Sequence, residues 1–169
     1  MKEIVTLFAG FLAILSCSAQ SSVIDNSLSG ELSLDKYLGD WYEIARFDHV
    51  FERGIQFSKA NYTLREDGKV AVLNSGIKDG KAKDANGKAK LTDDPRVLRV
   101  SFFGPFYGDY RIMLLDEAYQ WVLVGGSSSK FLWILSRTPK LADDVRETIL
   151  AEATRRGYDI SKLIWVEQE

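Results

Sequence analysis

The sequence predicts an all-β protein: an eight-stranded antiparallel up-and-down barrel, or calyx, with a C-terminal α-helix packed outside it. Three observations predict this fold. Short segments that alternate apolar and polar residues recur about every ten residues from residue 41 onward, with turn residues between them. The apolar period lengthens to that of a helix after Pro139. The 169 residues, 46% of them hydrophobic, suffice for one packed domain and are too few for two.

The alternation defines eight candidate strands joined by hairpin turns. They cover about 41–47, 58–65, 69–75, 81–91, 96–103, 109–116, 119–125 and 130–136. Breaks are expected at Asp67-Gly68, Asp79-Gly80, Asn86-Gly87, Gly104-Pro105 and Gly125-Gly126. The segment 81–91 is so polar that a bulged, edge-like or partly looped conformation is expected there. Consecutive hairpins are the simplest topology.

One apolar stripe predicts a helix over about 142–156, which Gly157 can end. The stripe consists of Val145, Ile149, Leu150 and Ala153. Because the opposite side of the helix is polar, the helix is expected to pack on the outside of the barrel. A short final strand or apolar strap is expected from Ile160, Leu163, Ile164 and Trp165.

The N-terminus indicates export. Residues 1–16 are interpreted as a signal peptide, because the apolar run at 4–15 follows Lys2 and is too short to span a bilayer. The single cysteine, Cys17, follows Ile14-Leu15-Ser16, which resembles the lipobox of bacterial lipoproteins that are acylated on that cysteine. The alternative is ordinary cleavage after Cys17-Ser18-Ala19.

Residues 17–31 are expected to form a flexible tether if Cys17 is acylated, or a disordered tail if it is not. Residues 32–169 are expected to form the barrel domain. A formal net charge of −2 and a sequence pI of about 5.5 argue against nucleic acid as a partner. The single histidine, and the lack of both a P-loop and a cysteine beyond Cys17, give no expectation of a metal site or a cofactor.

Trp41 and Arg137 are expected to close one end of the barrel. Trp41 opens an alternating run, and Gly39 lets the chain turn sharply before it. Arg137 ends the face of the last strand that carries Trp133. A guanidinium stacked on Trp41 would contribute roughly 0.5 to 2 kcal/mol. Taken singly, the two residues are as well explained as a core tryptophan and a surface charge.

The faces expected to point inward are apolar, with phenol and indole groups interspersed. The expected ligand-binding residues are Tyr62, Val72, Asn74, Val100, Phe102, Tyr107, Ile112, Leu114 and Trp133. An eight-stranded interior is either filled by side chains or holds one small ligand. The polar Glu43 and Asn74 on the same faces would be costly to bury unpaired, so they favour a wet or liganded cavity, or else lie in water near the rim.

Three short motifs resemble the regions that define the lipocalins. They are Gly39-x-Trp41, the Gly108-Asp109-Tyr110 sequence before the sixth strand, and Arg137 after the eighth, in the same order and spacing. Longer strings over 41–47, 102–108 and 132–139 are similar to the bacterial outer-membrane lipoprotein branch of that family, related to apolipoprotein D. The resemblance covers residues 35–166. It departs at the polar fourth strand and at Gly108, where a threonine is usual.

The resemblance implies binding, storage or transport of fatty acids or lysophospholipids in the barrel at the bacterial cell envelope. It places a lid over the open end at 48–57, with Phe51 and Phe57 as apolar flaps. A head group would meet a cation near the opening, for which the candidates are Arg46, Lys59 and Lys130. The expected location is the outer membrane, facing the periplasm through an acylated Cys17, or else soluble in the periplasm or secreted. A homodimer is also an open expectation.

Catalysis is not expected, and a structural or interaction role is the alternative to ligand binding. An enzyme would have to use a carboxylate pair such as Glu43 and Asp109, although Asp109 is more simply explained as a turn residue that binds nearby backbone. A structural or interaction lipoprotein of the envelope would have a filled barrel and no ligand. Trp121 either forms an exposed aromatic patch for such a partner or lies at the rim beneath the helix.

Overall fold

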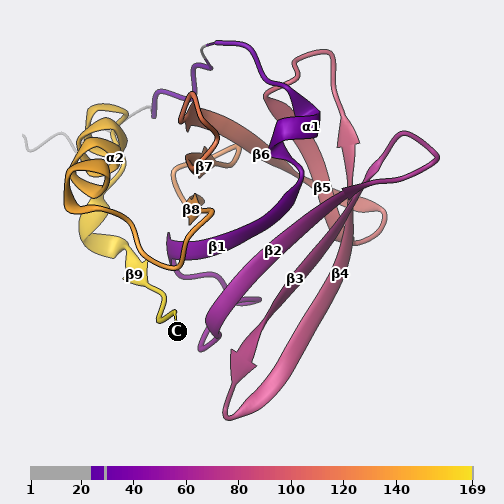
Figure 1. The fold of residues 1–169 in the computed structure, drawn as a ribbon, viewed down its shortest axis with the longest axis horizontal. Coiled ribbons are helices and arrows are strands. Elements are labelled where there is room, and N and C mark those ends of the chain that lie inside the picture. Colours follow the sequence, from indigo (N-terminus) through magenta and orange to yellow (C-terminus); the bar gives the residue numbers. More distant parts are fainter. Residues whose placement is uncertain (1–23, 29, 169) are drawn as a thin grey trace, which may run out of the picture.

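The barrel of the computed structural model is a closed meander. The structure describes residues 24–28 and 30–168, and within them nine strands form one antiparallel sheet. The order is β2-β3-β4-β5-β6-β7-β8-β1-β9, and a β2–β1 pairing closes the first eight (Figure 1). Their bounds are β1 Gly39–Arg46, β2 Gln56–Leu64, β3 Val70–Lys78, β4 Lys81–Leu91, β5 Val97–Phe103, β6 Phe106–Leu115, β7 Trp121–Gly125, β8 Leu132–Ser136 and β9 Ile164–Trp165. The predicted eight-stranded barrel is confirmed.

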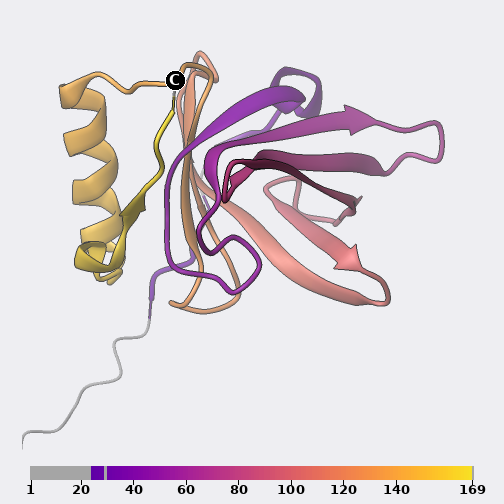
Figure 2. The same ribbon diagram turned by 90° about the horizontal axis from the view of Figure 1, so that it is seen from below.

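Helices lie at one end and on one side of the barrel. The short α1, Leu34–Tyr37, precedes β1, and α2, Asp143–Arg155, stands against the outer face of the sheet (Figures 1 and 2). The whole predicted stripe of α2 packs on that face. A single turn of 3₁₀ helix, Ile160–Lys162, then leads into β9, which pairs with β1. None of the described helices is long and apolar enough to cross a membrane.

Two apolar clusters hold the fold together, one on each side of the sheet. The inner cluster fills the closed half of the barrel and includes Trp41, Tyr62, Val72, Ile112 and Leu135. The outer cluster lies between the sheet and α2 and includes Ile44, Met113, Leu123, Ile149 and Tyr158. Trp121 packs in the outer cluster, so it lies beneath the helix and does not form an exposed aromatic patch.

The register shifts in four strands, β1, β2, β5 and β6, and the shifts in β1 and β6 change which of the predicted residues point inward. The register of β1 shifts between Glu43 and Ala45, and that of β6 between Ile112 and Leu114. A bulge places one extra residue in a strand, so the alternation reverses beyond it. Simple alternation puts Ala45 inside and Arg46 outside, whereas Ala45 packs in the outer cluster and the interior side holds Arg46.

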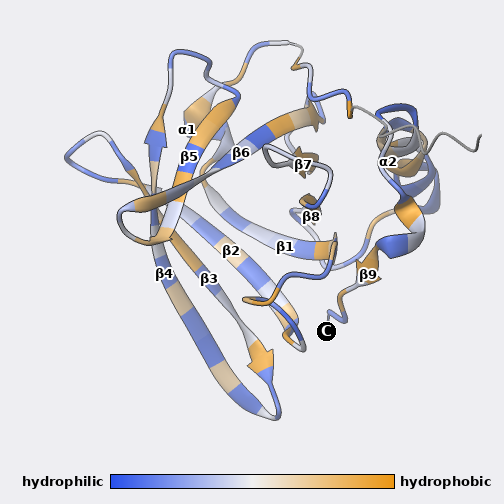
Figure 3. Cartoon of the chain, turned by 180° about the vertical axis from the view of Figure 1, so that it is seen from behind, coloured by the Kyte–Doolittle hydropathy of each residue, from blue (hydrophilic) through white to orange (hydrophobic). Residues whose placement is uncertain are grey.

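The polar segment 81–91 is a continuous strand, and it is edge-like for most of its length. β3 and β4 pair over their whole length, whereas β4 pairs with β5 only over Lys88–Leu91. Its first half is exposed on both faces, and in Figure 3 blue, hydrophilic bands alternate with paler ones along β4. The expected break at Asn86-Gly87 is wrong: a Cβ atom on Gly87 would lie 2.8 Å from ring carbons of Phe102, so the glycine makes room for that ring within the strand.

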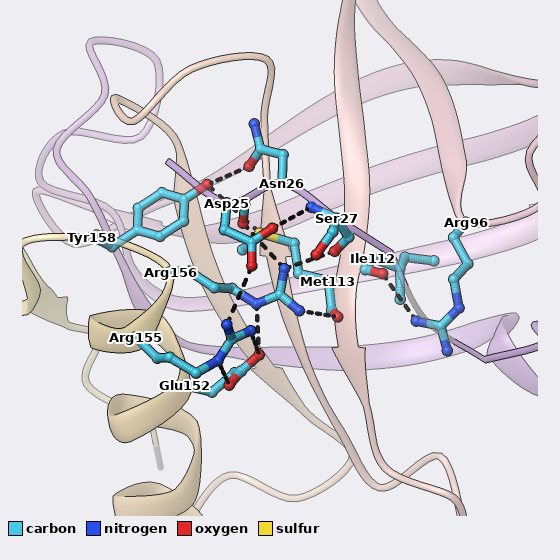
Figure 4. A network of polar contacts seen from close by, with 10 residues as sticks. All are labelled: Asp25, Asn26, Ser27, Arg96, Ile112, Met113, Glu152, Arg155, Arg156 and Tyr158. Carbon is cyan, nitrogen blue, oxygen red and sulfur yellow. Dashed lines mark hydrogen bonds and ion pairs between the residues drawn. The ribbon is translucent and has the colours of Figure 1, made fainter. Parts of the chain in front are cut away.

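The last part of the expected tether is packed on the domain. Ile24 and Leu28 join the outer cluster, and the Asp25 amide donates to the Arg156 carbonyl at 2.9 Å. Arg156 in turn donates to the carbonyls of Asp25 and Ser27, at 3.1 and 2.7 Å (Figure 4). The sequence could not indicate this docking, because the contacts join residues about 130 positions apart.

A C-terminal strap, residues 164–168, fills the gap where β1 leaves β2. β1 and β2 pair only over Gly39–Tyr42. Beyond Tyr42, β1 pairs with β8 and β9. The Gln168 side-chain amide donates to the carbonyls of Glu43 and Ser58 at 2.8 and 2.9 Å, one from each strand. The strap therefore completes the wall at this point.

Candidate ligand-binding site

Arg137 closes the narrow end of the barrel. Its guanidinium carbon lies 3.7 Å from the centre of the Trp41 ring. Its N–H groups donate to five carbonyls, those of Lys36, Tyr37, Leu38, Asp40 and Tyr119. Gly39 has a φ of +93°, a conformation that favours glycine, and this turn brings the chain over the guanidinium. The position of Arg137 on Trp41 agrees with the sequence prediction.

Directly above Trp41 the interior is filled. Tyr62, Val72 and Ile112, all expected to contact ligand, are buried there. The Tyr110 hydroxyl lies 2.6 Å from that of Tyr37 and 3.1 Å from that of Tyr62. Burial raises the pKa of Tyr62 and of Tyr110, so the hydroxyls stay neutral at physiological pH. This layer is a hydrogen-bonded floor.

The interior becomes accessible above that floor. Asn74, Val100, Phe102 and Trp133 are inward-facing and only half-buried. Ala85, Gly87 and Ala89 lie on the inward side of β4. Ala89 is fully buried, whereas Ala85, nearer the open end, is exposed. The barrel therefore widens into an open upper half, lined by an aliphatic side chain, two aromatic rings and an amide.

Two expected ligand-binding residues point out of the barrel. Tyr107 lies on the face of β6 opposite to Tyr110 and Ile112, with the Lys90 ammonium 4.4 Å from its ring centre. Leu114 follows the bulge in β6, pairs with Leu123 and packs in the outer cluster. Neither side chain lines the interior, so neither belongs to the candidate site.

The carboxylates considered for catalysis are on opposite sides of the sheet. Asp109 lies on the outer face and pairs with Arg99 and Arg111, at 3.2 and 3.0 Å. Glu43 is buried on the inner side and pairs with Arg46. The two groups therefore cannot act on one substrate atom, and Asp109 contacts arginine side chains in place of the expected backbone.

A buried ion cluster, Glu43, Arg46 and Glu52, ties the loop between β1 and β2 to the wall. Arg46 bonds to the Glu43 carboxylate and donates to the carbonyls of Glu52 and Ile55, each at 2.8 Å. The Glu52 carboxylate accepts from the Trp133 indole at 3.1 Å. Residues 47–55, hereafter the lid, are thus fixed from both sides.

Aromatic contacts add to this attachment. His49 of the lid is buried and packs with ring centres 5.0 Å from both Phe131 and Trp133. Phe51 points away and is 75% exposed, whereas Phe57 lies in β2 and is half-buried. Sequence reasoning missed Glu52 and His49 as interior groups. No local pattern in the sequence indicates these two contacts, because their partner, Trp133, is about 80 residues away.

The ion cluster carries perturbed protonation equilibria. Burial, with the charge of Glu52, raises the pKa of Glu43 to about 7, although Arg46 opposes the shift. Burial also raises the pKa of Glu52, against the hydrogen bond from Trp133. Burial and the charge of Arg46 lower the pKa of His49, which favours the neutral imidazole. Near neutral pH, Glu43 therefore changes its charge more readily than an ordinary glutamate.

Stability is expected to depend on pH through Glu43. Its pKa lies above the ordinary 4.5, so the folded protein binds more protons than the unfolded chain between pH 4.5 and 7, and stability falls as pH rises through that window. Glu43→Gln removes this dependence. We expect the unfolding free energy of the variant, relative to the parent, to rise by about 1–3 kcal/mol between pH 4.5 and 8. Urea titrations at several pH values measure it, and a difference that stays constant with pH would contradict the assignment.

Among the described residues, four buried side-chain polar atoms have no hydrogen-bond partner. Three of them belong to the lid and the inner wall, the Arg46 Nε, the His49 Nε2 and the Asn74 Oδ1, and the fourth is the Ser101 Oγ in β5. Such atoms are uncommon in folded proteins and mark places where a ligand or water bonds. Of the three cations expected to meet a head group, Arg46 is the one on the interior side. Lys59 packs over the Tyr42 ring on the outer face, and Lys130 is exposed in the β7–β8 loop.

Two surface clefts lie outside the barrel at its closed end, with volumes of about 330 and 340 Å³. Both are lined by Glu117 and Tyr119, and neither includes Asn74, Val100, Phe102 or Trp133 of the upper wall. Within residues 24–28 and 30–168, no three His, Cys, Asp or Glu side chains are grouped to hold a metal ion. The open upper half of the barrel is therefore the candidate site on the strength of its lining.

Comparisons with known proteins agree with this architecture. A family model described as a lipocalin-like domain matches residues 32–168. The outer membrane lipoprotein Blc of Escherichia coli K12 is 46% identical over 164 residues, covering 95% of this chain and 92% of that protein. Mouse apolipoprotein D is 32% identical over 147 residues, covering 79% and 75%. Lobster apocrustacyanin A1, with 18% identity and 80% and 79% coverage, has the same fold with a TM-score of 0.67.

Proposed function

The chain belongs to the lipocalin family, whose members bind small hydrophobic ligands, and we propose that its ligand is a fatty acid or a lysophospholipid held in the upper half of the barrel. The observation that carries this proposal is the change in burial along the inner wall. Tyr62, Val72 and Ile112 form a closed floor, and Val100, Phe102 and Trp133 above them remain half-exposed. An acyl chain bound in the upper half would cover these apolar side chains and remove them from water.

The energetics of this wall suit a long acyl chain. Each methylene group moved out of water contributes about 0.8 kcal/mol. About sixteen carbons would contribute up to roughly 12 kcal/mol, from which association and ordering subtract several kcal/mol. Micromolar or somewhat tighter affinity is therefore expected without any covalent step.

The unpartnered polar atoms suit the head group. The Arg46 Nε–H can donate to a carboxylate or phosphate oxygen, and the Asn74 Oδ1 can accept from a glycerol hydroxyl. The terminal nitrogens of Arg46 already hold Glu43 and the lid, so a ligand bound there would contact the same side chain that fixes the lid. This supports a single-chain amphiphile over a plain hydrocarbon.

Location and anchoring follow from the relatives. The similar bacterial proteins are outer membrane lipoproteins by name, which supports an outer-membrane location in the cell envelope. Acylation of Cys17, which lies outside the described residues, stays a prediction, as does a homodimer. A structural lipoprotein without ligand is the alternative that binding measurements distinguish.

The test is a fluorescence titration with lysophospholipid below its micelle concentration. Binding should quench tryptophan emission, because Trp133 lies on the half-exposed wall. Phe102→Ala should weaken affinity about tenfold or more, since it removes an aromatic wall contact. Tyr107→Ala is the matched control, because that ring lies outside the barrel on the neighbouring strand, and it should leave affinity unchanged.

Equal affinities of the Phe102→Ala and Tyr107→Ala variants for lysophospholipid would contradict binding inside the barrel. No measurable binding by the parent chain would favour the structural alternative.

A further inference from the structure

We propose that the open end of the barrel docks on an anionic lipid bilayer, with the lid inserted among the lipids. This inference rests on the proposed function, because docking would let a lipid enter the barrel directly from the membrane. It is carried by three features of the open end: an exposed apolar patch, an excess of cations around it, and the place at which the chain joins the domain.

The apolar patch consists of four side chains with their surfaces in solvent. Val50 and Phe51 of the lid are 74% and 75% exposed, and Phe103 and Phe106 beside the β5–β6 turn are 67% and 78% exposed. The rings of Phe51 and Phe103 meet with centres 6.0 Å apart. Since β1 and β5 are separated by three strands on either side of the barrel, this contact bridges the opening.

Cations lie at the base of the patch. The Lys88 ammonium lies 3.6 Å from the position of a Cβ atom on Gly104, in the turn between the two exposed phenylalanines. The Lys78 side chain lies equally close to Gly54 in the lid. Six cations and four exposed carboxylates occupy the open end: Arg53, Lys78, Lys81, Lys83, Lys88 and Lys130 against Asp48, which pairs with Arg53, and Asp79, Asp84 and Glu167. Aromatic side chains ringed by lysines suit the interface of an anionic bilayer.

The chain enters the domain at this same end. The Asn26 side chain donates to the carbonyl of Gly126, at the start of the β7–β8 loop of the open end. The next residues run toward the closed end, where the Gly30 carbonyl accepts from Arg96 at 2.8 Å. In Figure 2 the first described residues and the β5–β6 turn lie along the lower edge, and α1 lies along the upper edge.

This entry point limits where an anchor can lie. Asp25 is fixed to Arg155 and Arg156 (Figure 4), and Cys17 precedes it by eight residues. Eight residues span at most about 28 Å. An acyl group on Cys17 would therefore hold the domain close to the membrane by its open end, which is the end that carries the apolar patch.

Docking gives the lid a role in lipid entry. Insertion of Phe51 and Phe103 into the bilayer would replace their contact across the opening by contacts with acyl chains. The contacts of Arg46, His49 and Glu52 on its inner side would still retain the lid. A single-chain lipid could move from the bilayer to the half-exposed wall without crossing water.

The first test measures vesicle binding by the full chain carrying Cys17→Ala, so that no acyl group contributes. The chain should sediment with phosphatidylglycerol vesicles. Its binding to phosphatidylcholine vesicles should be at least several-fold weaker. Phe51→Ser with Phe106→Ser should weaken binding at least tenfold. The matched control is Leu64→Ser with Leu91→Ser, two side chains 46% exposed at the closed end, and it should bind as the parent does.

The second test reads the orientation. Cys17 is the single cysteine, so the Cys17→Ala chain accepts one fluorophore at Val50→Cys or at Glu66→Cys in the β2–β3 turn. Spin-labelled lipids should quench the emission of the fluorophore at Val50→Cys and leave that at Glu66→Cys unchanged. Equal quenching, or vesicle binding that is as strong in the patch variant as in the control, would overturn the proposal.

The lysophospholipid titration separates this inference from the proposed function. Normal lysophospholipid binding without vesicle binding would overturn docking alone, while loss of lysophospholipid binding in the parent would overturn the proposed function. Patch substitutions that change the oligomeric state and leave vesicle binding intact would assign the patch to contact between copies, and that result would also overturn docking.

Discussion

Arg137→Ala is expected to lower the free energy of unfolding by about 4 kcal/mol and the melting temperature by about 10 °C. The side chain stacks on Trp41 and donates to five backbone carbonyls that converge from α1, β1 and the β6–β7 turn. Alanine would leave these carbonyls without their charged donor and expose one face of the indole. Differential scanning calorimetry measures the change.

Two control variants define the cause. Arg137→Lys retains the charge and loses the planar guanidinium, so it should recover only part of the stability. Arg99→Ala removes an exposed arginine that pairs with Asp109, and should cost less than about 1 kcal/mol. Affinity for lysophospholipid should be retained in Arg137→Ala below its melting temperature, because the guanidinium lies beneath the floor. A melting temperature equal to that of the parent would contradict the bracing role.

Arg156→Ala is expected to cost about 3–5 kcal/mol and to release the first described residues from the domain. Arg156 is 3% exposed, and its guanidinium joins α2 to the first described segment and to β6 (Figure 4). It donates to the carbonyls of Asp25, Ser27 and Met113 and to the Glu152 carboxylate, at 3.1, 2.7, 3.1 and 2.8 Å. Urea unfolding measures the stability, and amide hydrogen exchange over residues 24–28 measures the release.

Arg155→Ala is the matched control for that variant. Arg155 is the neighbouring residue and shares Glu152 and Asp25 as partners, but its side chain is 57% exposed. Its removal should therefore cost less than about 1 kcal/mol and leave exchange over residues 24–28 slow. If the two variants behaved alike, burial of Arg156 would not be what fixes the segment.

The fold could be predicted because each strand repeats the same local rule. Leu98 and Val100, for example, alternate with the polar Arg99 and Ser101, and this pattern is sufficient to locate the strand and its inner face. Bulges are different, because they are selected by packing on both sides of the sheet. In β6 the run Ile112-Met113-Leu114-Leu115 is apolar throughout, so parity alone cannot show where the inner face changes.

The candidate site was predictable in its apolar part and not in its polar part. Trp133 follows from alternation along the regular strand β8, and Phe102 shares the parity of Val100 although the register of β5 shifts beside it. The Glu43–Arg46 pair does not, because residues three apart in a regular strand lie on opposite faces and meet here only through the bulge. The lid contacts of His49 and Glu52 join segments about 80 residues apart, which no local pattern records.

The C-terminal strap makes completion of the wall a late event in folding. Gln168 joins Glu43 and Ser58 across 125 and 110 residues of chain, so these bonds form only after both ends of the barrel are in place. Contacts of such long sequence separation slow folding, because the entropy of closing the loop is lost before the contact forms. Until residues 164–168 are in place, the wall beyond Gly39–Tyr42, where β1 has left β2, lacks the two bonds that Gln168 makes across it.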